Sequence, residues 1–391
     1  MRILYISQKP AFPIVDGGSF AINRFLHDLS ASFIGEIDYL VFSTDKHPFD
    51  INSNLHNTFK NITFYPLNIN TNLSFFSFLL SCFSTIPYNV KRYHDQSILL
   101  KIKERLAIIE YDYIFLDGFY TTAFLPELKA LSNAKIIYRS HNIEHQIWID
   151  RARLSKNGLK RIVLNLLAKK VAKYEERLPD NIDYIAAICD TDYRYFKKNA
   201  RSIVQVIPVS IPPTTPNDSI QLNQICFIGN FNWFPNVEGI CWFIDNVFFV
   251  LKKEYPSLVF HIAGYGSDVE LRQYKNDAII VHGAVADSLA FIKAHGIFIS
   301  PIFSGSGIKI KVLEAMNTGA PVVLSQKSAE GIHFSSTRSF FETKEEATEQ
   351  IKSLLDSAHL MEENRKEMIA IIKAQFSQDA VIAKLKSILH D

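Results

Sequence analysis

A glycine-rich turn followed by two lysines and a glutamate is the segment of this sequence best suited to chemistry. Gly305 and Gly307 flank a single serine, and glycines let a backbone approach a ligand closely. A helix is expected from about Ile308 to Thr318, and the free amides of its first turn favour an anion such as a phosphate. Lys309 falls in that turn, where its charge opposes the helix dipole unless an anion lies between them. The segment therefore predicts a phosphate site.

Two charged residues further along this helix suggest what carries the phosphate. Lys311 and Glu314 are three residues apart, so they share one face of the helix. A carboxylate one turn below a phosphate can accept hydrogen bonds from two hydroxyls of a ribose. The same spacing also fits an ordinary ion pair on a solvated helix face, worth roughly 0.2–0.5 kcal/mol. The spacing alone leaves both interpretations open.

The helix has strands on both sides, and this alternation extends along the chain. Gly319 and Pro321 end the helix, because they suit a left-handed cap and a helix stop. Short apolar runs separated by helix-length segments are typical of parallel sheets covered by helices on both faces. The expected strands are Arg2–Ser7, Glu36–Phe42, Asn61–Tyr65, Tyr113–Leu116, Ala134–Tyr138 and Tyr184–Ala187, then Gln224–Ile228, Leu258–Ala263, Ala278–Val281, Ile297–Ser300 and Pro321–Leu324.

The length and the prolines indicate two domains. The chain has 391 residues, more than one core usually supports. Four prolines between Pro208 and Pro216 make a segment that cannot enter a sheet interior. We therefore expect an α/β fold of two facing Rossmann-like domains, 1–207 and 220–374, joined by a linker at 208–219. Ligands bind outside the carboxyl ends of such sheets, which places the site in the cleft between the domains. By analogy, a helix at 375–391 is expected to return to the first domain.

Composition excludes several classes of protein. The 42 basic and 40 acidic residues give a net charge of +2, which does not indicate a nucleic-acid partner. The four cysteines lie far apart, so neither a disulfide framework nor a zinc site is expected. The most apolar stretch, Leu73–Phe83, is too short for a membrane helix of about 20 residues. No signal peptide is expected either, so we predict a cytoplasmic protein.

The charge is nevertheless uneven. Residues 151–177 contain nine basic residues and two acidic ones. One helical stripe carries Lys169, Lys173 and Arg177, and another carries Ile162, Val163, Leu166 and Leu167. With the apolar 73–83 segment beside it, such a helix can dock on an anionic membrane at the inner face of the cell membrane, where a lipid-linked acceptor is found. The alternative is that its apolar stripe packs on its own domain and its lysines are merely solvated.

The glycine-rich turn and its helix resemble the donor-binding signature of family 4 glycosyltransferases, retaining enzymes with the two-domain GT-B fold. The resemblance extends to other segments in the same order along nearly the whole chain. The resembling segments are Gly17-Gly18, Arg139–Glu144, Phe227–Gly239, Ile262–Gly266, Val281–Gly283 and Gly305–Val323.

The resemblance implies a role for each matching residue. Lys309, Lys311 and the turn would bind the diphosphate, Glu314 the ribose, and His141 the donor sugar or phosphate. The alternatives to these roles are a satisfied, partly buried histidine at His141 and a plain tight turn at Gly17-Gly18. The implied catalytic residues are His141, Lys309 and Glu314. The implied donor- and substrate-binding residues are Gly17, Gly18, Arg139, Asn142, Gly229, Asn230, Asn232, Gly264, His282, Gly283, Ser304, Gly305, Ser306, Gly307, Ile308 and Lys311.

The sequence departs from the family in three places. Ser306 replaces the first of two glutamates that many members carry, and Asn230 and Asn232 replace a basic pair. The only D-x-D, Asp190 and Asp192, is interpreted as a helix cap rather than a metal site. The phosphate charge would then rest on Lys309, Lys311 and backbone amides, and no metal is expected.

The prediction is therefore a retaining glycosyltransferase. It would move a sugar from a nucleotide diphosphate sugar to a glycan, a lipid-linked molecule or another hydroxyl acceptor. The expected process is assembly of bacterial lipopolysaccharide, capsule or exopolysaccharide. No cofactor is expected apart from the donor substrate, and no nucleic acid. The alternatives are a nucleotide-sugar 2-epimerase and a non-catalytic nucleotide-sugar-binding partner of a transferase complex.

Overall fold

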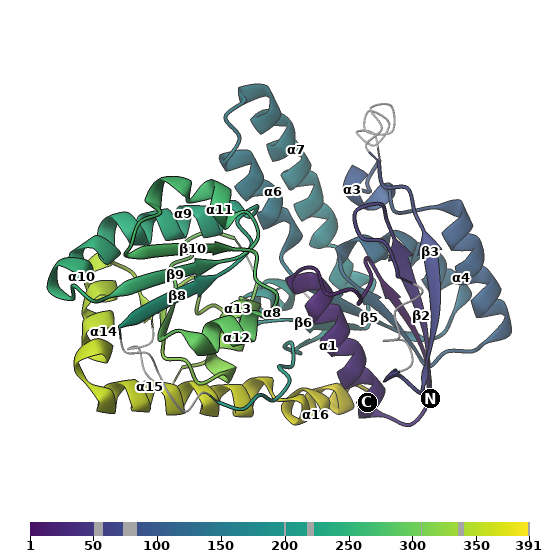
Figure 1. Cartoon of the computed structure of the whole chain (residues 1–391). Helices are drawn as coiled ribbons and strands as arrows, with labels where there is room; N and C mark the ends of the chain where they lie inside the picture. The colour runs from purple at the N-terminus through teal and green to yellow at the C-terminus, as the bar shows by residue number, and fades with distance from the viewer. Residues whose placement is uncertain are drawn as a thin grey trace. The chain divides into compact units, whose positions relative to one another are not determined.

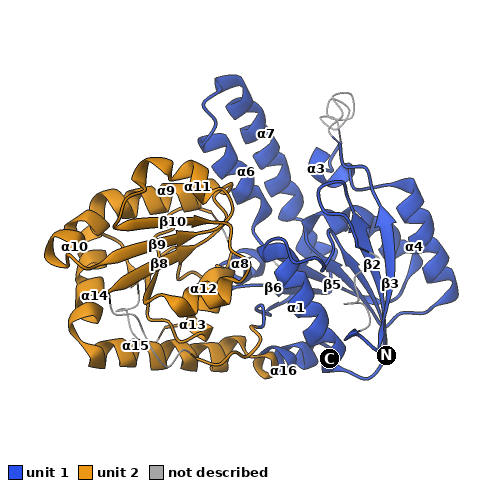
Figure 2. Cartoon of the chain, viewed as in Figure 1, with its two compact units in different colours: residues 1–210, 381–391 blue, residues 211–380 orange. Residues whose placement is uncertain are grey.

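The computed structural model describes residues 1–50, 58–72, 84–198, 201–216, 223–305, 307–334 and 340–389. It divides into two compact units. Unit 1 comprises Met1–Ser210 and Val381–Asp391, and unit 2 comprises Ile211–Ala380 (Figure 2). The division after Ser210 lies inside the expected linker, and the helical residues from Val381 onward belong to unit 1.

Unit 1 contains a parallel sheet with the strand order β3-β2-β1-β4-β5-β6-β7 among its described residues. The strands are β1 (Arg2–Ser7), β2 (Glu36–Ser43), β3 (Ile62–Asn68), β4 (Tyr113–Asp117), β5 (Lys135–Ser140), β6 (Tyr184–Ala187) and β7 (Ile203–Val206). The helices are α1 (Gly17–Ser32), α3 (Tyr88–Lys91), α4 (Gln96–Ile108), α5 (Leu125–Leu131), α6 (Glu144–Arg153), α7 (Gly158–Glu175), α8 (Asp190–Lys197) and α16 (Gln378–Leu389). They cover both faces of the sheet (Figure 1).

The core of unit 1 follows from the alternation of side chains along its strands. In β1, Ile3 and Tyr5 point to one face and Leu4 and Ile6 to the other, and all four are fully buried. The first face packs against α1 and α16, and the second packs against α4 and α7. Strands buried on both faces must be apolar throughout, which explains the continuous apolar runs in the sequence.

The helix α16 completes this core from a distant part of the chain. Val381, Leu385 and Ile388 are buried in the same cluster as the apolar face of α1. The Tyr113 hydroxyl donates to the Leu389 carbonyl at 3.0 Å, which joins the helix end to β4.

Unit 2 repeats this architecture with the strand order β10-β9-β8-β11-β12-β13. The strands are β8 (Gln224–Ile228), β9 (Val259–Ala263), β10 (Ile279–Gly283), β11 (Ile297–Ser300), β12 (Val322–Ser325) and β13 (Phe340–Phe341). The helices are α9 (Phe234–Phe243), α10 (Phe249–Glu254), α11 (Ser267–Glu270), α12 (Ser288–Ala294), α13 (Ile310–Asn317), α14 (Lys344–Asp356) and α15 (Ala358–Ile371). Two parallel-sheet units of this kind confirm the predicted α/β class. The edge strands β7 and β13 were not expected.

One helix among the described residues is long and apolar enough to cross a membrane. It runs from Phe234 to Glu254 through a π-helical turn, and half of its apolar window is buried. Phe243, Val247 and Leu251 are fully buried, so this helix packs in the core of unit 2.

The loops after three strands of unit 2 are joined by close backbone contacts. The Gly229 amide donates to the Ala263 carbonyl at 3.1 Å, and the Gly264 amide donates to the Gly283 carbonyl at 2.7 Å. Gly264 has φ +127°, and a Cβ there would lie 1.7 Å from the Gly229 carbonyl oxygen. Only glycine fits this position, because any side chain would separate the loops after β8 and β9.

We therefore expect Gly264→Ala to lower the stability of unit 2 by at least about 2 kcal/mol, since it adds both strain and a clash with backbone. The matched control is Gly158→Ala at the start of α7, where a Cβ meets nothing within 4 Å. That variant should be neutral or slightly stabilising. Thermal unfolding of both variants measures the effect, and equal melting temperatures would contradict the close contact.

Candidate functional site

The predicted glycine-rich turn lies between β11 and α13. Gly305 has φ +89° and Gly307 has φ +79°, conformations that favour glycine. A Cβ on Gly305 would lie 2.6 Å from Cζ2 of Trp233, so the indole closes one side of the turn. Ser306 lies outside the described residues.

The helix α13 begins two residues later than expected, which changes the place of Lys309. The expectation placed Ile308 and Lys309 in the first turn, but α13 begins at Ile310, and Lys309 is its non-helical N-cap residue. The expectation failed because the extended backbone of the turn continues through Lys309. Its Nζ donates to the Gly307 carbonyl at 2.7 Å and lies 5.9 Å from the centre of the Trp233 ring. The ammonium group is thus held over the turn.

The structure joins Lys311 and Glu314 in an ion pair. Lys311 Nζ donates to Glu314 Oε2 at 2.6 Å and to the Ser288 hydroxyl at 2.9 Å. The Lys311 side chain is 41% exposed, but Glu314 is only 8% exposed, so the carboxylate of the pair is buried. A buried carboxylate held by one lysine has oxygen lone pairs left for further hydrogen bonds.

A pocket of about 650 Å³ opens at the ends of β9 and β10. Three of the predicted residues line it: Asn232, His282 and Gly283. Tyr265, Gly266 and Val281 also line it and belong to segments that resemble the family. The remaining lining was not expected from the sequence: Asp268, Val269, Glu270, Lys275 and Ala284. Several of these lie on or beside α11, a four-residue helix that carries no recognisable motif.

Helix α9 contacts predicted residues through two side chains. Asn236 contacts the loop after β8, and Glu238 contacts the glycine-rich turn. The Ser304 hydroxyl donates to Glu238 Oε2 at 3.0 Å. The Asn236 side chain donates to the Asn230 carbonyl at 2.8 Å, and a Cβ on Gly229 would lie 2.8 Å from that side chain. Glu238 was missed because nothing in the spacing of α9 relates it to a turn 66 residues away.

In unit 1, the predicted residues at the end of β5 form a buried polar network with β4. Arg139 is fully buried, and its Nη1 donates to Asp117 Oδ2 at 3.2 Å. His141 Nε2 bonds the other oxygen of Asp117 and lies 3.0 Å from Arg139 Nη1. The Tyr5 hydroxyl also donates to Asp117. Asn142 follows His141, and its carbonyl accepts from the Ser140 hydroxyl at 3.0 Å.

The charges in this network determine its protonation. Burial alone would raise the pKa of Asp117, but His141, Arg139 and the hydrogen bonds lower it to about 2. Burial lowers the pKa of His141, although the negative charge of Asp117 raises it in part. At neutral pH, Asp117 is ionised and can only accept, so His141 Nε2 carries the proton. The lone pair of the imidazole then lies on Nδ1.

Gly17 and Gly18 form the first turn of α1 rather than a simple tight turn. Asp16 is the N-cap, accepting from the Ser19 amide at 2.8 Å, and its carboxylate pairs with Lys9 Nζ at 2.6 Å. A Cβ on Gly18 would lie 2.5 Å from that Nζ. Lys9 was missed by the sequence analysis, although it follows the first strand directly.

Solved structures resemble the whole chain. The HepE protein of Anabaena, solved in complex with UDP, superposes with a TM-score of 0.65 at 13% identity, covering 100% of both chains. The chain has the GT-B fold. The pneumococcal O-GlcNAc transferase GtfA, solved with UDP and GlcNAc, matches 76% of this chain with a TM-score of 0.55 at 17% identity. This chain spans 60% of the length of GtfA.

Sequence comparison gives a finer assignment for unit 2. Residues 223–357 match the family Glycosyl transferases group 1. An uncharacterized 44.6 kDa protein in the cps region of Klebsiella pneumoniae is 26% identical over 350 residues, which cover 84% of each chain. Most of unit 2 thus resembles this glycosyltransferase family.

Asp190, Asp192 and His145 of unit 1 lie in structural positions at helix beginnings. Asp190 and Asp192 do not cap α8, because its N-cap residue is Cys189 and no side chain makes a cap hydrogen bond. The two carboxylates lie in the first turn, where the helix dipole favours them. His145 Nδ1 bonds the buried carboxylate of Glu175 at 2.7 Å.

Asp117→Asn should destabilise unit 1 by about 3–5 kcal/mol at pH 7, because it leaves the buried Arg139 without its counter-charge. In the wild type, the ionised Asp117 contributes about 2 kcal/mol above pH 4, and this contribution is lost as the pH falls through its folded pKa of about 2. The difference between wild type and variant should therefore shrink from pH 4 downward.

Thermal unfolding at several pH values measures this difference. The control is Asp112→Asn, at the exposed beginning of the same strand. A constant difference across the acid range, or an equally damaging control, would show that Asp117 is not the ionised centre of the network.

Proposed function

We propose that this protein is a retaining glycosyltransferase that uses a nucleotide diphosphate sugar to extend a surface glycan. One observation carries the proposal: the glycine-rich turn, its lysines and a pocket of about 650 Å³ lie within the domain that matches group 1 glycosyltransferases. The pocket lies at the carboxyl ends of parallel strands, where such folds bind nucleotides. The similarity to the Klebsiella cps-region protein supports a role in surface glycan assembly.

In this proposal, unit 2 binds the donor. The pocket has the volume of a nucleoside site, and the β10 end at His282 and Gly283 contacts the base. The turn amides, Lys309 and Lys311 bind the diphosphate, and Glu314 accepts from the ribose hydroxyls. HepE and GtfA were solved with UDP, so uridine nucleotides are the first to test.

Glu238 is proposed to contact the donor sugar. The family usually supplies a glutamate at the place of Ser306, and the carboxylate of Glu238 lies 3.0 Å from the neighbouring Ser304 hydroxyl. It therefore brings a carboxylate from α9 to the turn that lacks one. A carboxylate there can accept hydrogen bonds from two sugar hydroxyls.

The network of unit 1 is proposed to act in catalysis through His141. Its neutral ring presents Nδ1 as an acceptor, which suits a hydroxyl of the donor sugar, and Asp117 fixes the ring orientation. The diphosphate that leaves would be stabilised by Lys309, Lys311 and backbone amides, without a metal ion. Catalysis would then rest on positioning and on this charge stabilisation rather than on a protein nucleophile.

We also propose that the protein is cytoplasmic and that unit 1 docks on the anionic inner face of the cell membrane. Only part of the apolar surface of α7 packs on its own unit. Leu167 contacts the core, whereas Leu159, Ile162 and Leu166 are 73%, 58% and 62% exposed. Exposed basic residues on the same helix include Lys160, Arg161, Lys169 and Lys173. An exposed apolar stripe beside lysines fits an anionic lipid surface, where a lipid-linked acceptor is found. The 73–83 segment lies outside the described residues.

Nucleotide binding tests the donor site. UDP, other nucleoside diphosphates and their sugars should raise the melting temperature of the wild type, since ligands stabilise the state they bind. Glu314→Gln should weaken binding of UDP and UDP-sugars alike, about 10–100-fold, because each loses the ribose contact. Glu238→Gln should leave UDP binding unchanged and weaken only the UDP-sugar.

Glu349→Gln on the exposed face of α14 is the matched control and should bind as the wild type does. Release of UDP from a UDP-sugar, with and without acceptors, completes the test. No response to any nucleotide diphosphate would reject the proposed function, and binding without turnover would favour a non-catalytic partner. Release of a free epimer would favour the epimerase.

Membrane docking predicts that the wild type sediments with anionic vesicles. Changing Lys169, Lys170 and Lys173 to Glu should reduce the bound fraction more than about tenfold, because each lysine near such a surface is worth about 1 kcal/mol. The control changes Lys101, Lys103 and Lys129 to Glu, which alters the net charge equally at exposed positions on other helices. Vesicle binding that is absent in the wild type, or lost equally in both variants, would reject the α7 surface.

A further inference from the structure

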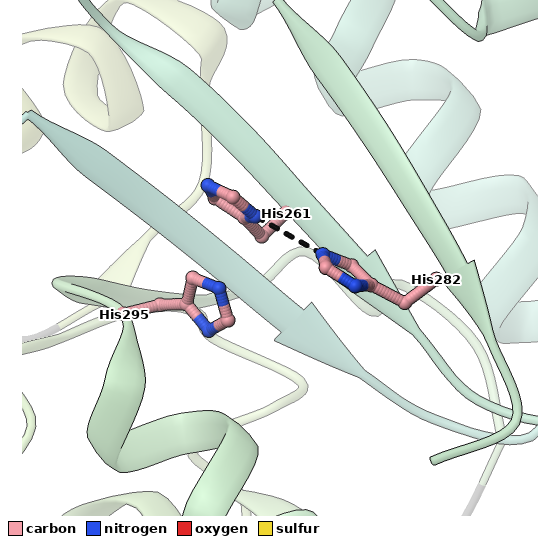
Figure 3. Close-up of side chains that lie close together, drawn as sticks. All are labelled: His261, His282 and His295. Carbon is pink, nitrogen blue, oxygen red and sulfur yellow. Dashed lines mark hydrogen bonds between the residues drawn. The ribbon is translucent and has the colours of Figure 1, made fainter.

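Three histidines from distant parts of the sequence meet on one face of the unit 2 sheet. His261 lies on β9, His282 on the neighbouring β10, and His295 directly after α12 (Figure 3). The ring centre of His261 lies 4.0 Å from that of His295 and 5.4 Å from that of His282. Figure 3 shows the three rings turned toward one another.

The ring nitrogens are arranged so that each histidine can offer one lone pair. His295 Nδ1 donates to the Phe291 carbonyl at 2.6 Å, so its Nε2 carries the lone pair. A ring nitrogen held by a carbonyl in this way is the usual second contact of a metal-binding histidine. His261 Nδ1 and His282 Nε2 share a hydrogen bond of 3.1 Å. One of these two nitrogens carries the proton of this hydrogen bond. When that proton moves to the other nitrogen of the same ring, His261 Nδ1 and His282 Nε2 each carry a lone pair.

The surroundings keep the three rings in the form that binds metals. Burial, with the neighbouring rings, lowers the pKa of His261 to about 4. Partial loss of contact with water also lowers the pKa of His282 and of His295. All three imidazoles are therefore neutral at pH 7, as a metal ligand must be.

We propose that His261, His282 and His295 bind a divalent transition-metal ion, with Zn²⁺ as the probe. One nitrogen from each ring lies within 4.8 Å of those of the other two. Ligand nitrogens about 2.0–2.1 Å from a tetrahedral Zn²⁺ are about 3.3 Å apart. The nitrogens therefore need to approach one another by about 1.5 Å or less, which small side-chain rotations can supply. Three neutral imidazoles suit Zn²⁺, Ni²⁺ or Cu²⁺ far better than Mg²⁺ or Ca²⁺. The fourth position is left for water or another small ligand.

Such an ion would join three separate elements of unit 2. It would hold the end of α12 against β9 and β10 and would stand beside the pocket that His282 lines. The proposal does not depend on glycosyl transfer, since it rests on the histidines alone. The expectation of no metal site rested on the cysteines and on the D-x-D alone. These histidines are separated by 20 and 12 residues, unlike the short spacings of common zinc motifs, so no motif marks them.

Metal titration of the full chain without a histidine tag tests the site. The metal-stripped wild type should bind about one equivalent of Zn²⁺, and Co²⁺ should give the visible absorption of a tetrahedral site. His282→Gln and His295→Gln should each weaken Zn²⁺ binding more than about 100-fold. Loss of a residue that only hydrogen-bonds a metal ligand costs about 10–100-fold. The control, His359→Gln, removes an exposed histidine from α15 and should bind as the wild type does.

His282 is the decisive position because its side chain is exposed, so its replacement should not disturb folding. Thermal unfolding without metal checks this, and Zn²⁺ should then raise the melting temperature of the wild type and the control only. Equal Zn²⁺ affinity in the wild type and in His282→Gln would overturn the proposal. A wild type without Zn²⁺ or Co²⁺ binding would overturn it as well.

Discussion

Parallel pairing of every strand in both sheets is the constraint on which the candidate sites depend. Because all strands run in one direction, their carboxyl ends gather at one edge of each sheet. Asp117 and His141 meet in unit 1 because β4 and β5 are neighbours that end together. In unit 2 the same rule brings together the loops after Ile228, Ala263 and Gly283. Residues far apart in sequence thus become neighbours without long loops to carry them.

The two units hold their strand ends by different physical means. In unit 1 a buried ion pair holds the strand ends: Arg139 stacks over Phe25 and pairs with Asp117. Removing two charges from water is costly unless each is well paired. Such a cost is justified where the pair orients another group, here His141. In unit 2 the loops meet through backbone alone, at Gly229 and Gly264, where the absence of side chains allows contact. One site is therefore organised by electrostatics and the other by sterics.

Local sequence patterns predicted the features that depend on local physics. Most strands were predicted to within about two residues, since strands buried on both faces must be continuous apolar runs. The turn at Gly305 and Gly307 was also predicted, because positive φ angles require glycine. Patterns failed where the partner lies elsewhere in the chain. Asp117 stood in no motif, and Glu238 lay in a resembling segment without a role assigned to it. Only folding shows what each carboxylate touches. The strand β11 was predicted with its correct bounds, but the start of α13 was placed two residues too early, because turn length decides where the helix begins.

The return of α16 to unit 1 has a consequence for how the protein is made. A ribosome synthesises all of unit 2 before it reaches Val381, Leu385 and Ile388, which are almost completely buried against the sheet of unit 1. Until then, the face shared by α1 and β1 lacks part of its cover, with about 1.5–3 kcal/mol of burial missing for each large side chain. Unit 2 is continuous in sequence and can finish folding first. The order of domain completion in the growing polypeptide is thus the reverse of the order in which the domains begin.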